Sequence, residues 1–207
     1  DNIKRGTAWV NDSLVYADYQ NPHPITGEYR LHRFSERVLT RHTRFLLFDL
    51  DGTLTDPAEG ITKSVVHALR YFGIEETDKK RLLSFIGPPL LETFTREYGL
   101  TDEQSWEALR VYREYFADIG LYENKVYDGI PDFLRDAQQA GYELIMATSK
   151  PEMYACRLMR HFGLTSYFSC IAGSDMAEKR ADKTSVILSA LARMGITDRS
   201  QTVMIGD

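Results

Sequence analysis

From about residue 44 onward, short apolar runs alternate with stretches whose apolar residues recur at helical spacing. Residues 45–48 form a continuous apolar run, which is typical of a strand buried on both faces. Residues 61–72 place apolar side chains at helical spacing, and Gly73 follows at the point where a helix would end. The pattern therefore predicts a buried strand followed by an amphipathic helix.

The chain between this strand and the next predicted one contains helical patterns only. Residues 90–98 predict a helix that ends at Gly99, and Thr101 with Gln104 forms the capping-box pattern that opens a long helix. No stretch of residues 61–124 alternates in the way that a strand does. We therefore expect a helical insert after the first strand.

Strands and helices alternate regularly beyond the insert. Strands are expected over residues 143–147, 167–172 and 202–205, and helices begin at residue 130 and cover 151–162 and 183–194. This order favours parallel strands joined by right-handed crossovers. We predict an α/β fold in which residues 44–60 and 125–207 form a Rossmann-like parallel-sheet core, and residues 61–124 form a separate α-helical domain.

Residues 1–43 follow neither pattern and stay unassigned. Residues 14–19 alternate weakly and are rich in tyrosine, which favours a strand. Arginines then recur at three- or four-residue spacing with only Glu36 opposing them: Arg30, Arg33, Arg37, Arg41 and Arg44. On a helix they would form one basic stripe, which is either an ordinary solvated face or a small patch that binds anions.

The overall composition is that of an ordinary globular protein. The 207 residues are 43% hydrophobic, and 25 Lys and Arg against 30 Asp and Glu leave a net charge of −5. Proteins that coat nucleic acids or bind anionic membranes are usually basic, so we expect neither partner. Cys156 and Cys170 give no disulfide framework, and no apolar stretch approaches a membrane span, so we expect a cytoplasmic protein.

The residues that follow the first strand carry the most distinctive chemistry. Asp49 and Asp51 are separated by one residue, and two carboxylates this close repel each other unless a cation or hydrogen-bond donors relieve them. Mg²⁺ prefers hard oxygen ligands of this kind. One carboxylate can attack phosphorus, and the other can act as acid for the leaving oxygen and base for water. Gly52 allows the backbone to approach a ligand closely.

Residues 48–54 (FDLDGTL) resemble the first motif of the haloacid dehalogenase superfamily. Three later sites resemble the other motifs of that family, in the order that the family keeps. Thr148 follows a predicted strand, Lys183 directly precedes an apolar helix, and the last predicted strand ends in Gly206-Asp207.

The resemblance implies a Mg²⁺-dependent phosphatase that works through an aspartyl-phosphate on a small phosphorylated metabolite. Asp49 would attack the phosphorus atom, and Asp51 would protonate the leaving oxygen and then deprotonate water. The remaining roles that the resemblance implies are phosphate binding by Thr148, Lys183 and Gly52, and metal binding by Asp49, Asp51 and Asp207.

The helical insert resembles the α-helical cap of the phosphoglycolate phosphatase-like branch, through the segment FIGPPL at residues 85–90. In that branch the cap closes over the site and selects the substrate. The fourth motif of the family normally continues past Gly-Asp to a second acidic residue, a strand and a helix. Since this chain stops at Asp207, we expect it to be truncated at its C-terminus.

Three alternatives stay open. A dehalogenase of the same superfamily uses the same nucleophile but needs no acid two residues later, so Asp51 argues against it. A sugar-phosphate mutase would keep Asp51 and would not release free phosphate. The third alternative is an inactive, truncated binding protein that docks through the basic N-terminal residues. The identity of the substrate and the oligomeric state are left open by the sequence.

Overall fold

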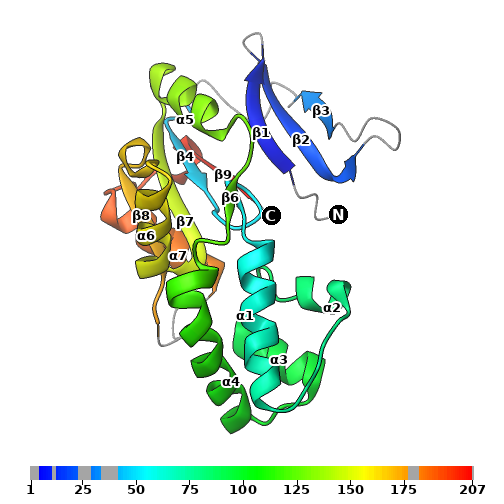
Figure 1. Ribbon diagram of the computed structural model, residues 1–207. Helices are drawn as coiled ribbons and strands as arrows, with labels where there is room; N and C mark the ends of the chain where they lie inside the picture. Colours follow the sequence, from blue (N-terminus) through cyan, green and yellow to red (C-terminus); the bar gives the residue numbers. More distant parts are fainter. Residues whose placement is uncertain (1–4, 11–12, 23–28, 34–41, 177–181, 207) are drawn as a thin grey trace. The chain divides into compact units, whose positions relative to one another are not determined.

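The computed structural model describes residues 42–176 and 182–206, together with the backbone of three strands nearer the N-terminus. Figure 1 shows the chain coloured along its length. It divides into two compact units, one formed by residues 1–55 and 126–207 and the other by residues 56–125. The assignment of residues 61–124 as a separate domain stays a prediction.

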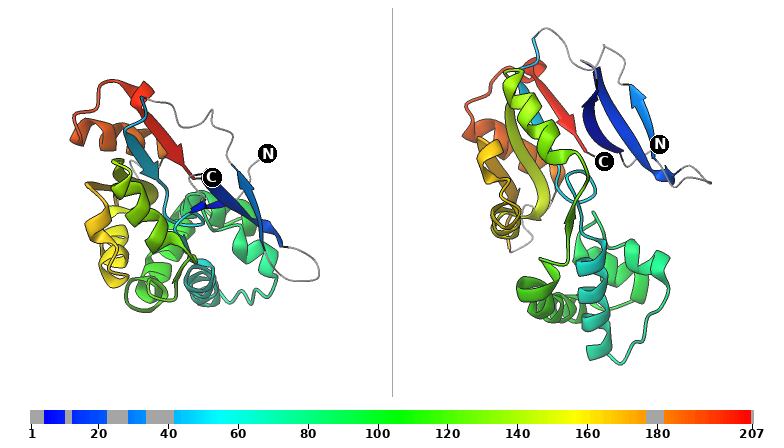
Figure 2. Two further views of the ribbon diagram at one scale, coloured as in Figure 1. Left: turned by 90° about the horizontal axis from the view of Figure 1, so that it is seen from above. Right: turned by 45° about the horizontal axis from the view of Figure 1, so that its top comes forward.

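The described part of the first unit contains a parallel sheet with the strand order β8-β7-β4-β9, which Figure 2 shows from two further directions. Its strands are β4 (Phe45–Phe48), β7 (Glu143–Pro151), β8 (Cys170–Ser174) and β9 (Thr202–Ile205). Its helices are α5 (Ile130–Gln139), α6 (Glu152–His161) and α7 (Lys183–Arg193), with 3₁₀ turns at Thr165–Tyr167 and Arg199–Gln201. The predicted α/β fold is confirmed.

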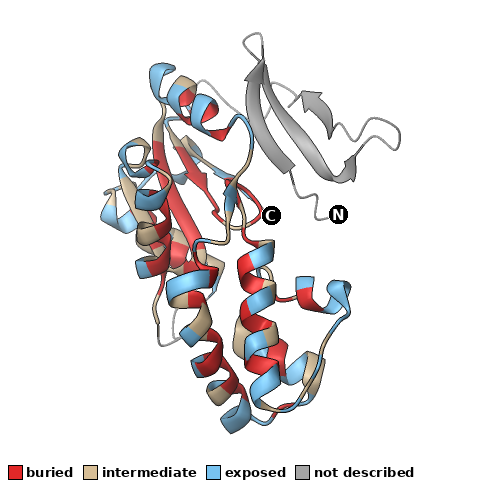
Figure 3. Cartoon of the chain, in the orientation of Figure 1, coloured by how far each residue is buried: buried red, intermediate tan, exposed pale blue. Residues whose placement is uncertain are grey.

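Helices pack on both faces of this sheet because its strands are apolar on both sides. Leu47 lies in a buried cluster with Val186 and Leu191 of α7. The next residue, Phe48, faces the other way, as successive strand residues do, and its ring lies 5.8 Å from that of Phe133 in α5. Figure 3 shows the resulting line of buried residues along the strands. The continuous apolar run of β4 is therefore explained by burial on two sides.

Two strands differ from their predicted bounds. β7 continues to Pro151 instead of ending at Ala147, and its pairing with β8 shifts register in this extension. β8 begins only at Cys170, after a 3₁₀ turn. The longer β7 places Thr148 and Lys150 on one strand.

The second unit is helical in its described residues, apart from two short strands at its ends. Its elements are α1 (Ala58–Tyr71), α2 (Lys79–Leu83), α3 (Leu90–Tyr98), α4 (Asp102–Tyr115) and a π-helical turn at Phe116–Gly120. The chain enters through β5 (Thr55–Asp56) and leaves through β6 (Lys125–Val126), and these two short strands pair with each other. The predicted capping box is confirmed, since Thr101 and Gln104 each accept the backbone N–H of the other.

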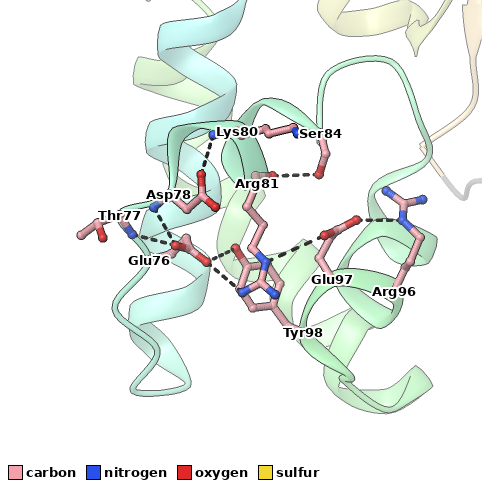
Figure 4. A network of polar contacts seen from close by, with 9 residues as sticks. All are labelled: Glu76, Thr77, Asp78, Lys80, Arg81, Ser84, Arg96, Glu97 and Tyr98. Carbon is pink, nitrogen blue, oxygen red and sulfur yellow. Dashed lines mark hydrogen bonds and ion pairs between the residues drawn. The ribbon is translucent and has the colours of Figure 1, made fainter.

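A polar network fixes the segment between α1 and α2 (Figure 4). The Glu76 carboxylate accepts the backbone N–H groups of Thr77 and Asp78 at 2.8 and 2.7 Å. It also accepts the hydroxyl of Tyr98 in α3 at 3.0 Å. Arg81 lies 3.3 Å from Glu76 and stacks over the Tyr98 ring. Burial, with the adjacent Glu76 carboxylate, raises the pKa of Tyr98.

α1 and the π-helical turn approach each other closely at two glycines. A Cβ placed on Gly60 would overlap the backbone carbonyl oxygen of Gly120. The Gly60 N–H donates to the carbonyl of Glu123 at 3.0 Å, and the Ser64 hydroxyl donates to the Gly60 carbonyl at 2.6 Å. A residue without a side chain is therefore required at position 60, although glycine is a poor helix former.

Gly60→Ala is expected to destabilise the chain by about 2–3 kcal/mol, because the added methyl group must displace the backbone at Gly120. This cost exceeds the gain of about 1 kcal/mol in helix propensity. Urea unfolding of the 207-residue chain measures the change. The control is Glu59→Ala, an exposed neighbour expected to change stability by less than about 0.5 kcal/mol. A Gly60→Ala variant as stable as the wild type would contradict the close approach.

The N-terminal strands form an antiparallel sheet in the order β1-β2-β3. They are β1 (Arg5–Val10), β2 (Ser13–Pro22) and β3 (Tyr29–Arg33). The strand predicted over residues 14–19 is confirmed within β2. The helical stripe is wrong for Arg30 and Arg33, because pairing with β2 holds them in extended backbone. Arg37 and Arg41 lie outside the described residues.

No helix in the described ranges of either unit is long and apolar enough to cross a membrane.

Candidate active site

The residues that the sequence singled out gather at the carboxyl edge of the parallel sheet. The end of β4 pairs with Met146 in β7 and with Ile205 in β9. Asp49 follows β4 directly, Thr148 lies just beyond Met146, and Gly206 follows β9. Open α/β sheets bind ligands at this edge, so the topology alone brings the first, second and fourth motifs together.

A tight turn after Asp49 fixes the position of Asp51. The carbonyl oxygen of Leu50 accepts three of the backbone N–H groups that follow it, at distances between 2.9 and 3.2 Å. Gly52 has a φ of 80°, which residues with a side chain rarely adopt, and its N–H donates to the Thr55 carbonyl at 2.8 Å. Gly52 is therefore required by the turn, and its role in phosphate binding stays a prediction.

Asp49 is 9% exposed, and three contacts hold it in place. Its N–H donates to the carbonyl of Ile205 at 2.9 Å, which ties the residue to β9. Its Oδ1 accepts the Leu50 N–H at 2.7 Å, and its Oδ2 forms an ion pair with Nζ of Lys183. The carboxylate is thus fixed with one oxygen beside a cation.

Lys183 reaches Asp49 from the first turn of α7. The helix begins at Lys183 because Asp182 caps it, its side chain accepting the Ser185 N–H at 2.8 Å. The structure therefore brings the predicted nucleophile and the predicted phosphate-binding lysine into contact. The role of Lys183 toward phosphate stays a prediction.

A second lysine, to which the sequence prediction assigned no role, lies beside Asp51. Nζ of Lys150 is 2.7 Å from Oδ2 of Asp51, and the two side chains are only 4% and 15% exposed. Thr148 is also buried, and its Oγ1 accepts the Lys150 N–H at 3.2 Å. The sequence could have indicated this position, because Thr148 and Lys150 are two residues apart and residues i and i+2 of a strand lie on the same face of the sheet. A strand continued past Ala147 puts Lys150 on the side of Thr148.

The charged side chains of this edge form two lysine–carboxylate pairs. Lys183 pairs with Asp49, and Lys150 pairs with Asp51. The sequence predicted that a cation or hydrogen-bond donors would relieve the repulsion between the two carboxylates, and the protein supplies two cations of its own. A lysine as buried as Lys150 is tolerated only with such a partner.

Gly206 brings the end of β9 against Asp49. A Cβ placed on Gly206 would lie 2.8 Å from Cβ of Asp49, which is closer than real Cβ contacts. Asp207, the next residue, lies outside the described residues, so its metal-binding role stays a prediction. Within residues 42–176 and 182–206, no cluster of three or more His, Cys, Asp and Glu is placed to hold a metal ion.

The sequence profile of the haloacid dehalogenase-like hydrolase family matches residues 46–207. The chain belongs to this family. The resemblance that the motifs at Asp49, Thr148 and Lys183 indicated is thereby confirmed. The match includes the helical insert as well as the sheet, and it contains both lysine–carboxylate pairs.

Several relatives of this hydrolase are known. A 5′-nucleotidase of Pseudomonas aeruginosa is 48% identical over 78% of this chain and 73% of its own length. Tyrosine-protein kinase PtkA of Mycobacterium tuberculosis is 40% identical over 79% of this chain, which spans 55% of the kinase. The crystal structure of a predicted phosphatase from Clostridium acetobutylicum is 42% identical, with a TM-score of 0.75 over 78% of this chain and 74% of that one.

Relatives named phosphoglycolate phosphatase also match, in agreement with the helical insert after the first strand. The haloacid dehalogenase-like hydrolase described here belongs to that branch, and its enzyme class is phosphoric monoester hydrolase.

Proposed function

We propose that this hydrolase cleaves a small phosphate monoester in a Mg²⁺-dependent reaction that passes through an aspartyl-phosphate at Asp49. The observation that supports this most is the pairing of two carboxylates after β4 with two lysines from different elements. Phosphoryl transfer asks the protein mainly for positioning and charge neutralisation. A fixed nucleophile, a neighbouring acid and base, and two ammonium groups meet that requirement.

The proposed reaction has two steps. In the first, an oxygen of Asp49 forms a bond to phosphorus while the bond between phosphorus and the leaving oxygen breaks. Asp51 donates a proton to that oxygen, so the product leaves as an alcohol. In the second step Asp51 takes a proton from water, whose oxygen attacks phosphorus. Inorganic phosphate is released and the Asp49 carboxylate is restored, with water as the only co-reactant.

Three residues are proposed to hold the phosphoryl oxygens. The Lys183 ammonium neutralises their charge next to Asp49, with which it already forms an ion pair. The buried Thr148 offers a hydroxyl at the same edge of the sheet. Gly52, with its positive φ, allows the backbone to come close to these oxygens.

The donor chemistry of this edge fits Mg²⁺. We propose the Asp49 carboxylate, the Asp51 backbone carbonyl and the Asp207 carboxylate as its ligands, all of which are hard oxygen donors. When bound, the ion stabilises negative charge on the phosphoryl group. The protein would hold these oxygens close together. The turn at Gly52 and the close approach of Gly206 to Asp49 support that role.

Nucleoside 5′-monophosphates are the substrates that we propose first, because the relative with 48% identity is named 5′-nucleotidase. Phosphoglycolate follows, because other relatives are named for it. Both are esters whose alkoxide leaving group needs an acid such as Asp51. We propose the cytosol as the compartment, where the thiols of Cys156 and Cys170 stay reduced.

The test is release of inorganic phosphate from a panel of phosphorylated metabolites by the 207-residue chain. We expect at least one monoester to be hydrolysed with Mg²⁺, chelation with EDTA to stop the reaction, and added Mg²⁺ to restore it. A mutase would isomerise a sugar phosphate without releasing phosphate. Hydrolysis of none of the esters, or hydrolysis that EDTA leaves unchanged, would contradict the proposal.

A further inference from the structure

The ion pair between Lys150 and Asp51 joins two distant parts of the sequence inside the core. Lys150 lies near the end of β7, and Asp51 lies in the turn after β4. Nζ of Lys150 is 2.7 Å from Oδ2 of Asp51, and only 4% of the lysine side chain is exposed. A lysine in this position loses most of its contact with water, so its ammonium has to be directed at a defined partner. The reaction proposed above counts this ammonium among the positive charges of the site and assigns it no task of its own.

The two carboxylate oxygens of Asp51 have different surroundings. Oδ2 accepts the hydrogen bond from Lys150. Oδ1 is buried and accepts no hydrogen bond from any residue in the described ranges. A buried oxygen without a donor is unfavourable, and a donor that arrives during the reaction would satisfy it. The attacking water is such a donor, and a protonated Oδ1 would itself donate to the leaving oxygen.

We propose that Lys150 is the positioning residue for the acid and base Asp51. By holding Oδ2, the ammonium group fixes the carboxyl in one orientation and leaves Oδ1 as the oxygen that gives and takes the proton. When Oδ1 carries the proton, Oδ2 becomes the carbonyl oxygen and still accepts from Nζ. This inference rests on the proposed function of Asp51.

The two lysines therefore have separate tasks. Lys183 contacts the candidate nucleophile Asp49, and its side chain is 28% exposed, which leaves it free to follow a phosphoryl group. Lys150 contacts Asp51 instead and is held by β7 on the side of Thr148. A nearly buried ammonium that is held in an ion pair suits positioning of a neighbouring group better than capture of a substrate.

The test compares two esters that differ in their need for an acid. The alkoxide of a nucleoside 5′-monophosphate must be protonated as it leaves, whereas the nitrophenolate of 4-nitrophenyl phosphate leaves without a proton. The ratio kcat/KM reports the steps up to release of the leaving group. A loss of kcat/KM that is confined to the first ester therefore isolates acid catalysis. We expect Lys150→Met to lower kcat/KM by about 10²-fold for the first ester and by less than about threefold for the second. Lys150→Arg should recover part of the loss.

Equal losses for both esters would overturn the inference, because they would make Lys150 a phosphate-binding or purely structural residue. So would a Lys150→Met variant as active as the wild type. The matched control is Lys79→Met, at an exposed lysine of α2, which should leave both values unchanged. In an Asp51→Asn background Lys150→Met should cause no further loss, because Lys150 acts through Asp51.

Folding is checked by circular dichroism and thermal melting of each variant. If Lys150→Met fails to fold, the double variant, which lacks both charges of the pair, decides, and a ratio of the two esters that differs from that of Asp51→Asn overturns the inference. A different result would contradict the proposed function: Asp51→Asn would hydrolyse the nucleotide as well as the wild type does. The inference alone is contradicted if Asp51→Asn loses more kcat/KM with the nucleotide than with 4-nitrophenyl phosphate, but Lys150→Met does not.

Discussion

Asp49→Asn is expected to lower phosphate release by more than about 10³-fold while the chain stays folded. The neutral amide of asparagine does not attack phosphorus to form an acyl-phosphate, so the first step is lost. The amide has nearly the size of the carboxylate, and its oxygen can still accept the Leu50 N–H. The ion pair with Lys183 is lost, but this lysine is 28% exposed and can turn toward water. Phosphate release and circular dichroism measure both parts of the prediction.

The matched control for this substitution is Asp132→Asn in α5. Asp132 pairs with Arg135 at 2.7 Å, and 71% of its side chain is exposed. Because exposed pairs contribute little, the control should keep its activity within about twofold of the wild type. An Asp49→Asn variant that retains more than about 1% of wild-type phosphate release would contradict covalent catalysis by Asp49.

Asp51→Asn is expected to lower kcat/KM for a nucleoside monophosphate by about 10²–10⁴-fold, the usual contribution of general acid–base catalysis. Asparagine can neither protonate the alkoxide nor take the proton from water. The first step with 4-nitrophenyl phosphate should be nearly unaffected, because nitrophenolate leaves without a proton. The second step still needs a base, so a rapid release of nitrophenolate should precede slow turnover. Stopped-flow absorbance measures this burst.

The stability of Asp51→Asn has to be measured beside its activity. The substitution removes the carboxylate from the nearly buried ammonium of Lys150, so we expect a lower melting temperature. Kinetics are therefore compared well below the melting temperature of the variant. A loss of less than about threefold with the nucleotide, in a folded variant, would remove Asp51 from the role of acid and base.

Much of the core could be predicted because its patterns are local. The apolar run of β4 reflects burial on two faces, and the capping box at Thr101 and Gln104 needs only residues of the same turn. The start of α7 at Lys183 likewise follows from the cap at Asp182. Since parallel strands share one carboxyl edge, correct strands were sufficient to bring Asp49 and Thr148 together.

The features that escaped prediction depend on contacts between distant residues. Lys150 gains its partner only because β7 runs beyond Ala147 and lies beside β4. The glycine requirement at Gly60 comes from Gly120 in another element, and that at Gly206 comes from Asp49. The arginines near the N-terminus have helical spacing, but pairing with β2 places Arg30 and Arg33 in a strand.

Trapping of the phosphorylated enzyme tests covalent catalysis by Asp49 most directly. Asp51→Asn is mixed with 4-nitrophenyl phosphate and Mg²⁺, because slow hydrolysis of the intermediate should let it accumulate. The reaction is quenched in acid within the first turnover, and the mass of the peptide that contains Asp49 is measured. We expect one added phosphoryl group on Asp49, and none when Asp49→Asn is added to the variant. Release of nitrophenolate in the first turnover with no phosphoryl group on Asp49 would contradict the mechanism.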